Sequence, residues 1–173
     1  MCAALIPSLQ NFISSNNYSP TRHKEQIMTA ETKPNVKQAV PFFSVSNIKA
    51  SVRFYVEGLG FEMIHKWEPD GKLRWCWLQC GDAALMLQEF RKEGRNSWVP
   101  EGKVGEGVSI VFVCEDALKI YRRIRHRGIE VSNPFVGNGM WVVSLNDPDG
   151  FSICFESDTD VPEGTEFSED LNQ

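Results

Sequence analysis

The sequence predicts an α+β fold made of two βαβββ modules that pair around a cleft. The middle of the chain repeats itself, because Gly60-Phe61-Glu62-Met63 returns 68 positions later as Gly128-Ile129-Glu130-Val131. Each copy also has the same order of predicted elements, which is a strand, a helix and three strands. A repeat of this length indicates supersecondary units with a common packing pattern, so two copies predict two modules related by an approximate two-fold axis.

The first predicted module spans 38–90. Ser46 and Asn47 are residue types that begin helices by accepting a backbone N–H bond, and the helix is expected to run to about Gly58. Pro69-Asp70-Gly71 predicts a turn, because proline fixes φ and glycine accepts a positive φ. The strands expected in this module are 40–45, 61–66, 73–80 and 83–90.

The second predicted module spans 108–157 and follows a polar, glycine-rich linker over 91–107. Its helix is expected over 116–127, and Gly128 is a residue type that ends helices. The run 146–150, Asn-Asp-Pro-Asp-Gly, is dense in turn formers and predicts a hairpin. The strands expected in this module are 108–113, 129–131, 140–145 and 151–156.

Composition separates the two ends from this core. Residues 1–37 lack hydrophobic periodicity and predict a disordered extension, in which Met1 and Met28 are both candidate starts of translation. The segment 158–173 holds six acidic residues and predicts a solvated acidic tail.

Charge and cysteine usage exclude several classes of function. A net charge of −5 and a pI near 5.3 argue against nucleic acid, which needs a basic face. No apolar run reaches membrane-spanning length, and the first seven residues lack the pattern of a secretory signal. Five cysteines, an odd number, predict reduced thiols rather than a disulfide framework. We therefore expect a cytoplasmic protein without membrane or nucleic-acid partners.

Two motifs carry a resemblance to a known family. Ser51-Val52-Arg53-Phe54-Tyr55 followed by Gly58-Leu59-Gly60-Phe61 resembles a signature of the vicinal oxygen chelate superfamily. Asp147-Pro148-Asp149-Gly150 resembles the turn that precedes the last strand in that superfamily. The resemblance covers roughly 38–157 and implies paired βαβββ modules whose sheets curve around a cleft. Members include glyoxalase I, extradiol dioxygenases and bleomycin-resistance proteins.

The metal-using members of the superfamily place four ligands on the first and fourth strands of the modules. The motifs and the 68-residue offset place these positions at Val40, Met86, Val108 and Cys154. Valine has no lone pair to donate, and a thioether with a thiol does not satisfy Zn, Mg, Mn or Fe(II). A register shift of two residues offers one amide and one carboxylate, from Gln88 and Glu156, and still no imidazole. The sequence therefore predicts no metal and no cofactor.

A cleft lined this way favours an apolar or aromatic ligand that a few polar groups orient. Tryptophan can stack on a planar ligand and donate one hydrogen bond. The acidic balance of the chain is also compatible with a cationic ligand. The candidate ligand-binding residues are Phe42, Trp75, Trp77, Gln88, Trp98, Val108, Ile110, Trp141 and Glu156.

Three functions compete. The leading hypothesis is metal-independent sequestration of a small organic molecule, aromatic or cationic, as in bleomycin-resistance proteins. That hypothesis implies a homodimer with a shared cleft and a role in antibiotic resistance. The second hypothesis is a glyoxalase- or isomerase-like enzyme with Glu156, Glu89 or His65 as its base. The third is a domain for protein association without a small ligand.

Overall fold

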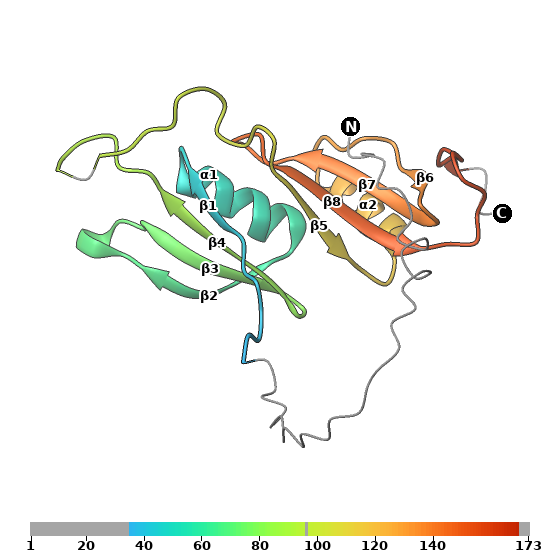
Figure 1. The fold of residues 1–173 in the computed structure, drawn as a ribbon, viewed down its shortest axis with the longest axis horizontal. Helices are drawn as coiled ribbons and strands as arrows, with labels where there is room; N and C mark the ends of the chain where they lie inside the picture. The colour runs from blue at the N-terminus through green and yellow to red at the C-terminus, as the bar shows by residue number, and fades with distance from the viewer. Residues whose placement is uncertain (1–34, 96, 170–173) are drawn as a thin grey trace, which may run out of the picture. The chain divides into compact units, whose positions relative to one another are not determined.

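Two four-stranded sheets carry the fold, one in each module, in the computed structural model, which describes residues 35–95 and 97–169 (Figure 1). The strand orders are β1-β4-β3-β2 and β5-β8-β7-β6, so the first and fourth strands of each module are neighbours. These neighbours pair in parallel, and all other pairs are antiparallel. The predicted α+β architecture of two βαβββ modules is confirmed.

The elements of the first module follow the prediction to within a few residues. Its helix has two parts, because α1 passes directly into the wider π-helical turns of η2. A short 3₁₀ turn, η3, occupies the predicted Pro-Asp-Gly turn. The elements are β1 (Phe42–Val45), α1 (Ile48–Val52), η2 (Arg53–Leu59), β2 (Glu62–Trp67), η3 (Pro69–Gly71), β3 (Trp75–Cys80) and β4 (Ala83–Glu89).

The second module contains one strand that the sequence analysis placed wrongly. Residues 129–131 form no strand, and the pairing partner of β7 lies further on, at Phe135–Gly137. Asn138 and Gly139 both have positive φ and form the two-residue turn between these strands, as Asn-Gly commonly does. The elements are β5 (Ser109–Val113), α2 (Ala117–His126), β6 (Phe135–Gly137), β7 (Met140–Asn146) and β8 (Ser152–Asp158).

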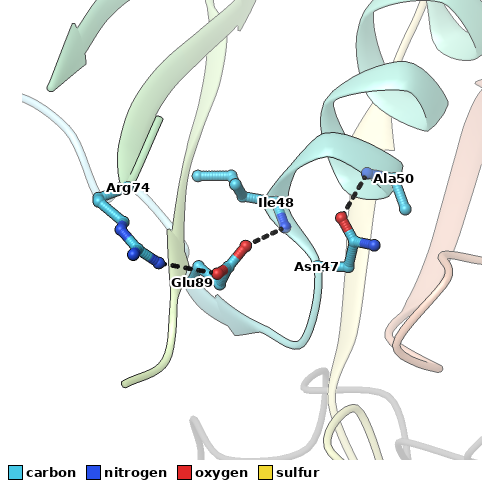
Figure 2. Close-up of polar contacts among 5 residues, drawn as sticks. All are labelled: Asn47, Ile48, Ala50, Arg74 and Glu89. Atoms are coloured by element: carbon cyan, nitrogen blue, oxygen red, sulfur yellow. Dashed lines mark hydrogen bonds and ion pairs between the residues drawn. The ribbon is translucent and has the colours of Figure 1, made fainter. Parts of the chain in front are cut away.

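Both helices begin with a side-chain cap. The Asn47 side chain accepts the backbone N–H of Ala50 at the start of α1, and Asp116 accepts that of Lys119 at the start of α2. A second group also supports α1, because a Glu89 carboxylate oxygen accepts the backbone N–H of Ile48 at 3.1 Å (Figure 2). The last strand of the first sheet is thereby tied to the helix that packs on it.

The two family-like motifs meet in the interior. The Tyr55 hydroxyl donates to Asp147 Oδ2 at 3.2 Å, and Asp147 Oδ1 also accepts the backbone N–H groups of Asp149 and Phe151. The Asp149 carboxylate in turn accepts the backbone N–H of Ser46. Burial raises the pKa of both Tyr55 and Asp147 above their ordinary values. These bonds give both motifs a structural role at the junction of the modules.

Aromatic and cationic side chains complete that junction. Phe43 stacks on Phe151 with ring centroids 4.0 Å apart, and Phe61 packs against Phe112 at 5.5 Å. Arg127 of the second module donates to the carbonyl oxygen of Gly58, near the end of η2, at 2.8 Å. A guanidinium is favourable there, because the last carbonyl groups of a helix lack partners within it.

The C-terminal segment departs from the expectation of a solvated tail. Phe167 is only 6% exposed and packs edge-on against Tyr121 and Trp141. The backbone N–H of Phe167 donates to the carbonyl oxygen of Pro134. The backbone N–H of Val136 donates to the carbonyl oxygen of Thr165. The folded module therefore continues to at least this phenylalanine. Within residues 35–95 and 97–169, no helix is long and apolar enough to cross a membrane.

Candidate functional site

One side of the first sheet is aromatic and not covered by α1. Residues that pair across neighbouring strands point to the same side of a sheet, so the strand register gives the composition of each side. On the side against α1, Val45, Leu78 and Leu87 are fully buried. On the opposite side, which we call the open face, Phe42 is 53% and Trp67 50% exposed.

Two rows of side chains cross the open face. They contain four phenylalanine and tryptophan rings, one thioether and three polar or titratable side chains. The first row is Phe42, Met86, Trp77 and His65, and the second is Ser44, Gln88, Trp75 and Trp67.

The sequence analysis identified half of this face. Phe42, Trp75, Trp77 and Gln88 were all predicted, and the register brings them together. It missed Trp67, which lies one residue beyond the expected strand 61–66 but ends β2 directly opposite Trp75. A signal was available, since Trp67 and Trp75 flank the predicted Pro-Asp-Gly turn at distances that suit a hairpin.

In the second sheet, the prediction that Ile110 shares the side of Cys154 is wrong. Ile110 pairs with Ile153 and packs against the core, whereas Val111 pairs with Cys154. The repeat offset fails here because the spacing between paired residues on the first and fourth strands differs between the modules. Phe42 pairs with Met86, 44 residues later (86 − 42), whereas Val111 pairs with Cys154, only 43 residues later (154 − 111). A difference of one residue moves a side chain to the other face of a sheet.

Three further predicted residues lie in separate places. Glu156 is half-buried in a row with Val113 and Val142, on the side of the sheet away from the core. Val108 precedes β5 and is 40% exposed. Trp141 is buried against Phe167 on the core side, so it does not share a surface with Glu156.

A hollow of about 940 Å³ lies at one end of the open face. Ser44, Gln88 and Trp67 of the second row line it, together with Trp98 from the linker. Trp98 is 57% exposed and its ring lies edge-on to Phe90 at 6.1 Å. The predicted candidate Trp98 is thereby placed next to the open face, although it lies in the linker after β4 and not on a strand.

Glu89 and Arg74 also line this hollow, where they form an ion pair at 2.9 Å (Figure 2). Because the other carboxylate oxygen of Glu89 accepts the N–H of Ile48, both oxygens have partners. This arrangement disfavours Glu89 as a general base, which must be free to accept a proton. Of the other candidate bases, His65 lies on the open face next to Trp77, and Glu156 lies on the second sheet.

The side chains at the superfamily's metal positions do not fit a divalent cation. In the observed register the corresponding pairs are Phe42 with Met86 and Val111 with Cys154, and Val40 and Val108 lie outside the strands. Phenylalanine and valine have no donor atoms, and Cys154 is fully buried with Sγ 3.5 Å from Ser144 Oγ. Across the described part of the chain, no group of three or more His, Cys, Asp or Glu side chains could hold a metal ion.

Comparison with known proteins gives consistent results. A bleomycin resistance protein from Geobacillus stearothermophilus is 28% identical over 129 residues, covering 68% of this chain and 94% of the relative. The structure of a bleomycin-binding protein complexed with bleomycin covers 73% of this chain and 100% of its own, with 21% identity and a TM-score of 0.53. A lactoylglutathione lyase from Agrobacterium tumefaciens covers 72% and 95%, with 19% identity and a TM-score of 0.55.

The two structural matches show the fold and nothing further, because a shared fold at low identity does not determine the activity. Residues 37–155, more than half of the chain, match the model of the glyoxalase/bleomycin resistance protein/dioxygenase superfamily. This match includes both sequence motifs and all of both sheets except the end of β8. The chain therefore belongs to the glyoxalase/bleomycin resistance protein/dioxygenase superfamily.

Proposed function

We propose that the protein captures a small organic molecule on the open face of its first sheet, without a metal and without chemical conversion. The observation that carries this proposal is the pair of rows with Phe42, Trp67, Trp75 and Trp77. Such a surface offers flat apolar area and few nucleophilic groups. Gln88 supplies an amide at the centre of the second row, where it can orient a bound molecule.

The energetics suit an aromatic ligand. Burial of apolar surface contributes about 25 cal/mol per Å², so covering roughly 200 Å² contributes about 5 kcal/mol. Offset or edge-on packing against the indole rings adds about 0.5–1.5 kcal/mol for each aromatic pair. The sum is partly offset by the loss of ligand freedom on binding, which leaves room for affinity in the micromolar range.

We also propose that a second copy of the chain covers the open face of the first sheet, so that the two copies together form the ligand-binding cleft. Val111 is 46% and Val113 80% exposed on β5, an edge strand of the second sheet, and Phe42 is on β1, an edge strand of the first. Exposed apolar side chains on sheet edges favour association, and a two-fold homodimer is the commonest way to bury them. Light scattering should give the mass of a dimer, and Val113→Glu should shift it toward the monomer.

Isothermal titration with bleomycin and a panel of aromatic compounds tests the binding proposal. Trp77→Ala should weaken binding at least about ten-fold, because it removes the central ring of the first row. Trp141→Phe is the matched control, since that tryptophan lies on the core side of the other sheet. Equal loss in both variants, or no binding by the native protein to any compound, would contradict the proposal.

The alternative is an enzyme related to the lactoylglutathione lyase. One observation favours it, because Glu156 is a half-buried carboxylate in a row with the apolar side chains of Val113 and Val142. A carboxylate among apolar groups is a suitable general base. Formation of lactoylglutathione by the native protein, lost in Glu156→Gln, would establish the enzyme in place of the binding protein.

A further inference from the structure

We propose that the molecule bound on the open face is a planar aromatic anion, whose charged group lies in the hollow beside Trp98. This inference rests on the proposed binding function and specifies the chemical class of the ligand. It differs from the expectation drawn from the net charge of −5, which is compatible with a cationic ligand. The local charges around the hollow favour the opposite sign.

The hollow is a continuation of the open face. Ser44, Gln88 and Trp67 belong to the second row of that face and also line the hollow. A flat molecule that lies against Trp67 can therefore contact residues of the open face and of the hollow together. At about 940 Å³ the hollow falls within the usual size range of small-molecule sites, about 300–1,000 Å³.

The half-exposed indole rings of Trp67 and Trp98 form apolar walls, and backbone hydrogen bonds fix the main chain of both residues. The backbone N–H of Trp98 donates to the carbonyl of Arg91 at 2.9 Å, and the ring of Trp98 contacts Phe90. The Trp67 carbonyl accepts the N–H of Arg74 at 3.0 Å across the η3 turn. These bonds fix the backbone of both residues, so less backbone freedom is lost on binding.

The ionic groups that line the hollow have a positive surplus. Arg74 and Glu89 form the ion pair described above, and the second Glu89 oxygen is held by the start of α1. Their charges therefore largely cancel. The remaining ionic groups that line the hollow are Lys72, Arg91, Lys92, Asp70 and Glu93, three positive and two negative.

None of these five groups is engaged in an ion pair within the described residues, so no neighbouring countercharge there cancels them. An anion that enters gains attraction from three cations and repulsion from two carboxylates. Lysine and arginine also supply only hydrogen-bond donors, which match an anionic oxygen. An aromatic cation would keep a favourable contact with the ring faces but would meet the positive surplus.

Two fluorescent probes with the same aromatic frame test this inference. 8-Anilinonaphthalene-1-sulfonate is an anion, and N-phenyl-1-naphthylamine is the neutral counterpart that lacks the sulfonate. At low ionic strength we expect the anion to bind native protein about five-fold more tightly, which is the effect of one favourable charge contact in water. Raising the salt concentration to about 1 M should remove most of that preference, because the screening length falls to about 3 Å.

Variants locate the effect. Lys72→Glu/Lys92→Glu should remove or reverse the preference for the anion, with a smaller change in affinity for the neutral probe than for the anion. Lys49→Glu/Lys119→Glu is the matched control, with the same change of charge on exposed lysines of the two helices, and it should keep the preference. Trp98→Ala should lower the affinity for both probes. Cooperative thermal unfolding of each variant shows that the fold is intact.

The outcomes separate this inference from the proposed function. Failure of both probes to bind native protein overturns the proposed function and the ligand class with it. Binding of both probes with equal affinity, or with a preference for the neutral one, overturns only the ligand class. A preference for the anion that both double variants lose equally also overturns it, because the attraction would then arise from the charge of the whole chain.

Discussion

The bond between Tyr55 and Asp147 gives the sharpest prediction about stability. Tyr55→Phe removes one hydroxyl group and keeps the ring, so the edge-on contacts with Phe54 at 5.1 Å and Phe61 at 5.8 Å remain. The hydroxyl donates to Asp147 at 3.2 Å, and both residues are almost completely buried. The substitution therefore isolates one hydrogen bond between the two modules.

The size of the loss follows from that geometry. A hydrogen bond to a charged group contributes about 1.5–3 kcal/mol. The distance of 3.2 Å is long for a bond between two oxygen atoms, and Asp147 keeps its bonds from Asp149 and Phe151, both at 2.9 Å. We therefore expect Tyr55→Phe to lower the free energy of unfolding by the lower end of that range, about 1.5 kcal/mol. For a domain of this size the corresponding fall in Tm is about 5 °C.

Urea unfolding at pH 7, followed by tryptophan fluorescence, measures this free energy. Tyr121→Phe is the matched control, because its hydroxyl interacts with Arg125 and Asn133, which are exposed, and it should lose less than about 1 kcal/mol. A double-mutant cycle of Tyr55→Phe with Asp147→Asn should give a coupling energy close to the single loss. A loss below about 0.5 kcal/mol together with zero coupling would refute the reasoning.

The same pair predicts a dependence on alkaline pH. Burial, followed by the nearby charge of Asp147, raises the pKa of Tyr55 far above its ordinary value of about 10. Above pH 10 the unfolded chain loses this proton and the folded chain keeps it, so the free energy of unfolding falls as the pH rises. In Tyr55→Phe this contribution to the slope should be absent, and an unchanged slope between pH 9 and 11 would contradict the assignment.

Three further predictions concern other parts of the chain. Phe167→Ala should lower the free energy of unfolding by roughly 3 kcal/mol in urea titrations, because the ring is buried against Tyr121. An unchanged free energy of unfolding would instead support a solvated C-terminal tail. Arg127→Met should lower it by up to about 1 kcal/mol through loss of the bond to the Gly58 carbonyl, measured in the same titration. Burial raises the pKa of Cys76 to about 11, so at pH 8 its labelling by a thiol reagent, followed by mass spectrometry, should be no faster than unfolding.

Local signals in the sequence predicted most of the secondary structure. The Asn47 cap begins α1 as expected, and the turn at Pro69–Gly71 forms where proline and glycine require it. The one misplaced strand shows how such signals compete. The repeat favoured 129–131, whereas the Asn138-Gly139 turn, a stronger local signal, fixes the strand at Phe135–Gly137.

The candidate site was predictable only in part. Trp75, Trp77 and Gln88 were assigned correctly to one face, because side chains alternate along a strand and a tight turn pairs β3 with β4. The assignment of Phe42 to the same face followed from the family resemblance, since β1 pairs with the distant β4. Ile110 was assigned to the wrong face, since its pairing with β8 depends on the number of residues in everything that lies between them. A single residue more or less in that interval reverses the face, and no local pattern reports it.

The sequence by itself determined the fold class, the two modules and the superfamily, because these depend on periodicity, turn chemistry and motifs that are local in the chain. Only the tertiary structure decided which side chains share a surface. Trp67, Trp98 and Lys72 come from a strand end, a linker and a turn, yet all three line one hollow. Their convergence depends on the register of the sheet and the path of the linker. Both are set by the packing of the whole domain, for which no short segment of sequence carries a signal.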